Sequence, residues 1–195
     1  MNTPFVLEIY TESTPNPESQ KFVTNMSLLP NYVAEFKTKD SATESALAKS
    51  LFDIPFVSSI FISNDFITIT KKPEYEWYEV TPEIREGIQN FIKTGKPVVS
   101  EKLYRMGEVQ TMLVPDEEAT PESKIKDLLD KYVKPAVEND GGHIAFRSFE
   151  NGIVSLSLQG SCSGCPSSAI TLKSGIEGLL KRMVPEVISV EAIAE

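Results

Sequence analysis

The sequence is poor in the residues that build most active sites and metal sites. Its 195 residues include two cysteines, one histidine and one tryptophan. It also lacks a basic excess, because 19 lysines and arginines stand against 28 acidic residues. Nucleic-acid-binding domains normally carry a basic face, so we expect no nucleic-acid partner. No apolar run is long enough to cross a bilayer, so we expect no membrane association.

The N-terminal residues carry no recognisable targeting pattern. Residues 1–8 contain neither a basic segment followed by a long apolar core nor an arginine-rich stretch. We therefore expect a cytoplasmic protein, unless a targeting segment has been removed. In a reducing compartment, two nearby cysteines more often bind metal or do redox chemistry than form a structural disulfide.

The first hundred residues predict one small domain. Helices are expected at residues 41–51, where Ser41 and Glu44 form a capping box, and after Thr81, where Pro82 takes the first helical position. Runs rich in apolar and β-branched residues predict strands at residues 5–10, 21–25, 33–37, 57–63 and 66–71. We therefore expect two helices on one antiparallel sheet within residues 1–100.

A polar, acidic and proline-containing stretch, residues 101–120, predicts a flexible linker to a second domain at residues 121–195. In this domain a helix begins after Thr120, is kinked at Pro135 and ends at Asp140. Two strands joined by Asn151-Gly152, a helix from about Pro166 and a last strand follow, at residues 144–149, 153–158 and 187–190. The expected fold class is α+β, with two small α/β-sandwich domains, the second ordered α-β-β-α-β.

The two cysteines, Cys162 and Cys165, form a C-x-x-C pair framed by Gly160 and Gly164. They are expected between the end of a strand and the start of a helix, where backbone N–H groups and the helix dipole favour thiolate over thiol. Two sulfurs hold one side of a metal ion or cluster and do not complete a tetrahedral site. The remaining ligands come from elsewhere, for example from a second copy of the chain.

Three interpretations of this pair remain open from the residues alone. The first is a metal ion or iron–sulfur cluster shared by two chains, and zinc is not excluded by the spacing. The second is a dithiol oxidoreductase like thioredoxin, although that motif normally lies in a βαβ unit and a hairpin is expected here. The third is a pair of thiols with no role.

The longer frame around the cysteines resembles the C-terminal domain of NifU-like (Nfu-type) iron–sulfur proteins. The resemblance rests on residues 160–168 with 171–173, on the Asp-Gly-Gly segment at residues 134–142 and on residues 185–187. Residues 14–19 with 21–22 likewise resemble the Nfu N-terminal domain. One departure is Ser19-Gln20, where relatives often have Ser-Leu, and we expect only a local difference in packing there.

This resemblance implies a scaffold or carrier rather than an enzyme. It implies a [4Fe–4S] cluster held between two chains, with Cys162 and Cys165 of each chain as ligands. It also implies a homodimer or higher oligomer when the cluster is bound, upstream cluster donors, and delivery to apo-proteins. The modules that dock a cysteine desulfurase in the long nitrogen-fixation proteins are missing, so that assembly role is not carried over.

Two other features are given structural interpretations. His143 follows a turn, and we expect it to form a local hydrogen bond rather than to ligate metal. Trp77, with Tyr75 and Tyr78, lies in an acidic stretch. We expect these aromatic side chains to pack under a helix, with anchoring of a client protein as the alternative.

Overall fold

The computed structural model describes residues 6–30, 32–103, 120–162 and 166–193 of the chain. The chain divides into two compact units, one of residues 1–13 and 17–113 and the other of residues 14–16 and 114–195. Most of the expected linker, residues 101–120, lies outside the described residues. No helix in the described ranges is both long enough and apolar enough to cross a membrane.

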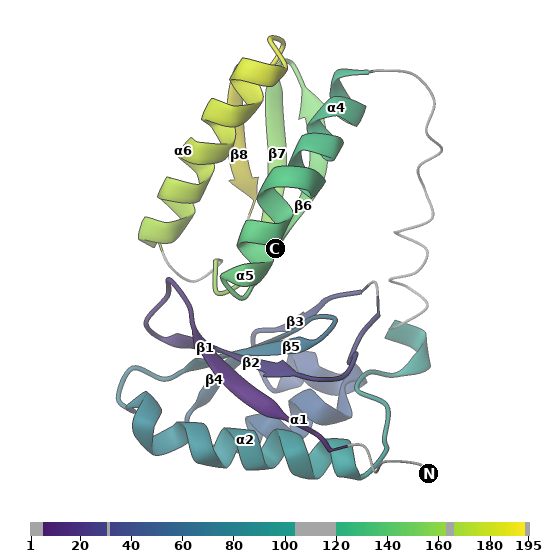
Figure 1. Ribbon diagram of the computed structural model, residues 1–195, viewed down its shortest axis with the longest axis vertical. Coiled ribbons are helices and arrows are strands. Elements are labelled where there is room, and N and C mark those ends of the chain that lie inside the picture. Colours follow the sequence, from purple (N-terminus) through teal and green to yellow (C-terminus); the bar gives the residue numbers. More distant parts are fainter. Residues whose placement is uncertain (1–5, 31, 104–119, 163–165, 194–195) are drawn as a thin grey trace. The chain divides into compact units, whose positions relative to one another are not determined.

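The N-terminal unit is built on a five-stranded antiparallel sheet with the order β1-β2-β5-β4-β3 (Figure 1). Its strands are β1 (Ile9–Ser13), β2 (Ser19–Thr24), β3 (Ala34–Phe36), β4 (Val57–Ile62) and β5 (Phe66–Lys71). The first strand begins later than expected, because its pairing with β2 sets its bounds: Ile9 lies opposite Thr24 and Ser13 opposite Gln20.

Two α-helices, α1 (Ala46–Phe52) and α2 (Trp77–Lys93), cover one face of this sheet. The expected capping box at Ser41 is wrong, because residues 40–44 form a 3₁₀ turn and Ser45 caps α1 by accepting from the Ala48 N–H at 3.1 Å. Fully buried isoleucines and leucines of helices and strands interlock, and each contributes about 1.5–3 kcal/mol by its removal from water.

Helix α2 begins one turn before the expected position. Trp77 is its first residue, so Pro82 lies inside the helix and not at its start. A proline there donates no hydrogen bond to the carbonyl four residues earlier, which belongs to Tyr78. Tyr78 is 78% exposed, so its expected packing under a helix is wrong. Tyr75 and Trp77 are partly buried against the core, as expected, and the Trp77 indole Nε1 donates to the Pro17 carbonyl at 2.9 Å.

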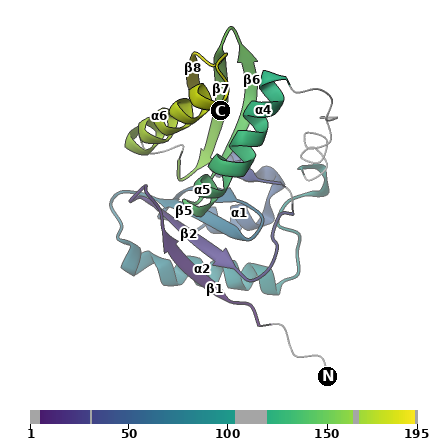
Figure 2. The ribbon, with the colours of Figure 1, turned by 45° about the horizontal axis from the view of Figure 1, so that its top comes forward.

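The C-terminal unit has the expected order of elements, and the α+β fold class is confirmed (Figures 1 and 2). Its three-stranded sheet has the order β6-β7-β8, with β6 and β7 antiparallel and β7 and β8 parallel. The helices pack their apolar faces on one side of the sheet. The elements are α4 (Pro121–Leu128), η2 (Leu129–Val133), α5 (Lys134–Asn139), β6 (Gly142–Glu150), β7 (Ile153–Gly160), α6 (Pro166–Met183) and β8 (Ser189–Ile193).

Pro135 has a larger effect than the expected kink. The five residues before α5 form a π-helical turn, η2, which separates α4 from α5. A proline leaves the carbonyl four residues earlier without its usual donor, and a wider turn is one way for a helix to absorb that defect. The last strand also shifts by two residues, because Ser189 pairs with Ile153 of β7.

The turn between β6 and β7 is a tight hairpin, as the Asn-Gly pair predicts. Asn151 and Gly152 both have positive φ, at 51° and 80°. A Cβ atom on Gly152 would lie 2.6 Å from Cγ1 of Ile188 and 3.0 Å from the Glu186 carbonyl oxygen. The turn therefore requires glycine for its backbone conformation and for its packing against the segment that leads into β8.

We predict that Gly152→Ala lowers the free energy of unfolding by about 1–3 kcal/mol, since it adds both a strained φ and a steric clash. Urea unfolding followed by circular dichroism measures this change. The matched control is Gly175→Ala in α6, where an added Cβ meets nothing within 4 Å. That control should stabilise the unit by about 0.5–1 kcal/mol. Equal effects of the two substitutions would contradict the packing role of Gly152.

Candidate functional site

Cys162 lies two residues after β7 ends and four residues before α6 begins. Its side chain belongs to the hydrophobic core cluster of the C-terminal unit, and the residue is only 5% exposed. The expected partner, Cys165, lies outside the described residues, so the structure gives no geometry for the pair. Within the described ranges, no three histidine, cysteine, aspartate or glutamate residues gather into a metal-binding group.

The residue before Cys162 fixes the loop to a turn some twenty residues earlier in the chain. The Ser161 N–H donates to the Gly141 carbonyl at 3.3 Å, and its hydroxyl donates to the Asp140 carbonyl. Ser161 is 1% exposed, so both bonds are shielded from water. The start of the cysteine loop is therefore held against the turn between α5 and β6.

Gly142, the first residue of β6, lies directly against the cysteine. A Cβ atom at this position would come within 2.8 Å of Cys162 Sγ and within 2.8 Å of the Gln159 carbonyl oxygen. Real side chains do not approach so closely, and a backbone oxygen does not move aside as a flexible side chain does. The absence of a side chain at Gly142 thus leaves the space that the Cys162 sulfur occupies.

This arrangement has a clear chemical consequence for Cys162. The sulfur is held in place from the turn side by Gly142 and Ser161, close in sequence to the start of α6. A cysteine sulfur held in one position by the surrounding fold is a candidate metal ligand. Sequence reasoning identified the cysteine but missed the contacts of Gly142 and Ser161, since no pattern links residues so distant in the chain.

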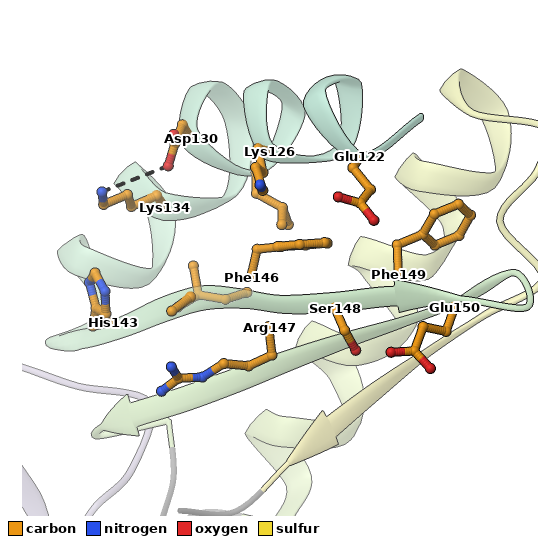
Figure 3. Close-up of a pocket in the computed structure, with 13 residues that line it drawn as sticks. Glu122, Lys126, Asp130, Lys134, His143, Phe146, Arg147, Ser148, Phe149 and Glu150 are labelled. Carbon is orange, nitrogen blue, oxygen red and sulfur yellow. Dashed lines mark ion pairs between the residues drawn. The ribbon is translucent and has the colours of Figure 1, made fainter. Parts of the chain in front are cut away.

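The local hydrogen bond expected of His143 is not made by its Nδ1 atom. Its Nδ1 atom is buried and has no hydrogen-bond partner in the structure. Burial lowers the pKa of the imidazole from 6.5 to about 4, with help from the positive charges of Lys134 and Arg147 and against the negative charge of Asp130. The side chain projects from β6 near Lys134 (Figure 3). At neutral pH this histidine is therefore uncharged.

Two family models match the chain, one for each unit. "Scaffold protein Nfu/NifU N terminal" matches residues 9–95, and "NifU-like domain" matches residues 125–191. The second match includes both cysteines as well as the turn at Gly142.

Curated relatives match almost the whole chain. The human "NFU1 iron-sulfur cluster scaffold homolog, mitochondrial" is 42% identical over 188 residues, which are 96% of this chain and 72% of the human protein. The relative of the same name from Drosophila willistoni is 41% identical over 95% of this chain and 63% of its own length. The chain thus spans roughly two thirds of the length of these relatives.

Solved structures give a weaker match. A NifU-like protein from Saccharomyces cerevisiae is 29% identical and superposes with a TM-score of 0.45, covering 52% of this chain and 91% of the yeast chain. A protein from Staphylococcus aureus is 23% identical with a TM-score of 0.38, over 42% of this chain and 98% of that chain. The family assignment therefore rests on the family models and the curated relatives.

The cytoplasmic location expected from the sequence is contradicted, because the curated relatives are named as mitochondrial proteins. Delivery to an organelle depends on a short segment with its own composition, so the residues of two folded domains carry no information about it.

Family models for both halves of the chain and relatives above 40% identity agree on one assignment. The chain belongs to the Nfu/NifU family of iron–sulfur cluster scaffold proteins.

Proposed function

We propose that this protein carries a [4Fe–4S] cluster between two copies of the chain and delivers it to apo-proteins. Cys162 and Cys165 of each copy supply the four thiolate ligands that such a cluster takes. The observation that carries this proposal is the fixed position of Cys162, against Gly142 and two residues after the end of β7. Family membership and the scaffold role in the relatives' names support it.

The cluster is cargo in this proposal, and the chain catalyses no bond-forming step. A site at the interface between two chains suits transfer of the cluster, because thiolates of the receiving protein replace the cysteine ligands one at a time. His143 stays outside the ligand set, since four sulfurs from two chains already complete the cluster. We further infer from the relatives' names that the protein works in mitochondria, with cluster donors and client proteins as its partners.

The alternative function, a thioredoxin-like dithiol oxidoreductase, has less support. The βαβ context typical of that motif is present, because β7, α6 and β8 follow one another and β7 pairs in parallel with β8. The family disfavours the alternative, since the matching model and relatives are named as scaffold proteins.

We predict that anaerobic incubation of the chain with iron and sulfide gives a brown dimer with about four irons per two chains. Cys162→Ala and Cys165→Ala should each abolish colour and cluster-linked dimerisation, because each variant chain keeps one cysteine and two chains then supply two thiolates instead of four. Iron and sulfide quantitation with size-exclusion chromatography measures both. A monomer that stays colourless but reduces insulin disulfides would point to the oxidoreductase, and zinc that iron cannot displace would point to a structural metal site.

A second prediction concerns the residue against which Cys162 packs. Gly142→Ala should lower cluster retention about tenfold or more relative to the unchanged chain, because the new methyl group must displace the Cys162 sulfur. Decay of the cluster absorption after addition of a chelator measures retention. Gly175→Ala serves again as the matched control, since it adds the same methyl group in open space. If the Gly142→Ala variant folds fully and retains the cluster as well as the unchanged chain does, Gly142 has no role in positioning Cys162.

A third prediction follows from the buried imidazole of His143. Its pKa is lowered on folding, so between about pH 4 and pH 6.5 the unfolded chain binds a proton that the folded chain does not. The contribution of His143 to the free energy of unfolding is fully present above pH 6.5. It is lost as the pH falls towards 4, by at most about 3 kcal/mol. His143 is the single histidine, so one imidazole NMR signal reports its titration directly. A midpoint near 6.5 in the folded chain would contradict the burial, and His143→Gln should remove this part of the pH dependence.

A further inference from the structure

A groove on the N-terminal unit lies between its two α-helices, which are labelled in Figure 1. One wall is α1 with the turn that follows it, and the other wall is α2. The cavity has a volume of about 460 Å³. Every residue that lines it lies within residues 50–94, so the groove is a feature of this unit by itself.

The surface of this groove is mainly apolar. Its lining includes Gly87 together with Ile54 and Phe91, which also belong to the hydrophobic core of the unit. A Cβ atom on Gly87 would lie 3.3 Å from Cδ2 of Leu51 and 3.4 Å from Cδ1 of Ile54. The two helices therefore touch at Gly87, and the groove follows the line between them.

The charged side chains that line the groove are both acidic. They are Glu83 and Glu86, which lie three residues apart and so face the same side of α2. Neither carboxylate forms an ion pair or a hydrogen bond with any other residue in the part of the chain that the structure describes. The two basic residues of α2, Arg85 and Lys93, do not line the groove.

The residues beside the groove on the α1 side do not balance these two charges. Lys49 donates to the Thr43 carbonyl at 2.8 Å, and Lys39 pairs with Asp53 at 2.5 Å. Residues 1–100 carry 13 acidic and nine basic side chains, so the wider field of this half of the chain has the same sign. Both the lining and its surroundings thus favour a cationic occupant.

The walls of the groove restrict how an occupant is held. The backbone N–H and C=O groups of a helix bond within the helix, so an occupant is bound through side chains and not as an added strand. The Ser50 hydroxyl donates to the Leu47 carbonyl at 2.8 Å, and the Thr94 hydroxyl donates to the Phe91 carbonyl at 2.6 Å. The polar groups left for an occupant are therefore the two carboxylates and the Asn90 amide.

An amphipathic helix laid into an apolar groove is the recurring mode of recognition for such a surface. A metal ion is a poorer fit, because nowhere in the described ranges do three histidine, cysteine, aspartate or glutamate residues gather into a metal-binding group. A pair of unbalanced carboxylates beside an apolar floor instead matches a helix with an apolar stripe and basic flanks.

We propose that this groove binds an amphipathic, basic helix of a partner protein. Its apolar side chains lie between α1 and α2, and lysine or arginine side chains face Glu83 and Glu86. The proposal rests on the carrier function only in taking the partner to be a cluster donor or a client protein. The groove itself is tested without any cluster.

The test uses the full, metal-free chain and four alanine-based peptides of about 18 residues, blocked at both ends and long enough to form a helix. Three peptides carry leucine at i, i+4 and i+7, with lysine, glutamine or glutamate along both flanks of this stripe. The fourth peptide has lysine flanks and serine in place of leucine. Fluorescence anisotropy measures the affinity of each labelled peptide for the unchanged chain and for three variants.

The first variant combines Glu83→Gln with Glu86→Gln and removes the charge of the groove. Its matched control combines Glu74→Gln with Glu76→Gln, which removes the same charge from the same unit outside the groove. The third variant, Asn90→Trp, fills the groove without a change of charge. Circular dichroism confirms that all three variants fold.

The lysine–leucine peptide should bind the unchanged chain about tenfold more tightly than the glutamine peptide, and the glutamate peptide should bind most weakly. The pair of substitutions at Glu83 and Glu86 should abolish this preference, and the control pair should keep it. Asn90→Trp should weaken the lysine–leucine and glutamine peptides by about tenfold each. In NMR spectra, the bound peptide should shift amide signals of α1 and α2.

Four results would overturn the proposal. The first is equal affinity of the lysine–leucine, glutamine and glutamate peptides, or no binding. The second is an equal effect of the two pairs of substitutions, which would assign the preference to the general charge of the unit. The third is equally tight binding of the serine peptide, which would exclude the apolar floor. The fourth is a metal-free dimer that Asn90→Trp dissociates, which would assign the groove to a second copy.

These results are independent of cluster binding. Iron and sulfide quantitation on the unchanged chain tests the carrier function, and the peptides test the groove on the metal-free chain. Loss of one function therefore leaves the other to be judged by its own measurement.

Discussion

The close approach of Gly142 to Cys162 is the constraint on which the candidate site depends. The two residues belong to different strand ends, and the sulfur occupies space that any side chain at Gly142 would fill. The hydrogen bonds of Ser161 to the turn at Asp140 and Gly141 hold the same two segments together. The position of Cys162 is thus set by the packing of the unit as a whole rather than by its own loop.

This way of holding the cysteine suits a protein that carries a cluster and releases it. Cys162 is part of the close-packed hydrophobic core, which restricts the positions open to its sulfur. In the proposed carrier, a ligand set divided between two chains would leave the exchange of thiolates to the interface between them.

Strand β6 connects the cysteine loop with helix α4. Its first residue lies against Cys162, and the Lys126 ammonium of α4 lies 5.0 Å from the centroid of the Phe146 ring in the middle of the strand. His143 lies between these two points on β6, and its imidazole is uncharged at neutral pH because burial lowers its pKa.

The sequence by itself determined the two α+β domains, the order of the elements, the Asn151-Gly152 hairpin and the cysteine pair, because local patterns and turn chemistry specify these features. It misplaced the start of α2 and the bounds of β1 and β8, since strand pairing and helix packing set those limits. Only the tertiary structure placed Gly142 against Cys162, buried Nδ1 of His143 and placed Lys126 over Phe146. These are contacts between residues far apart in the chain, and their geometry depends on how the elements pack.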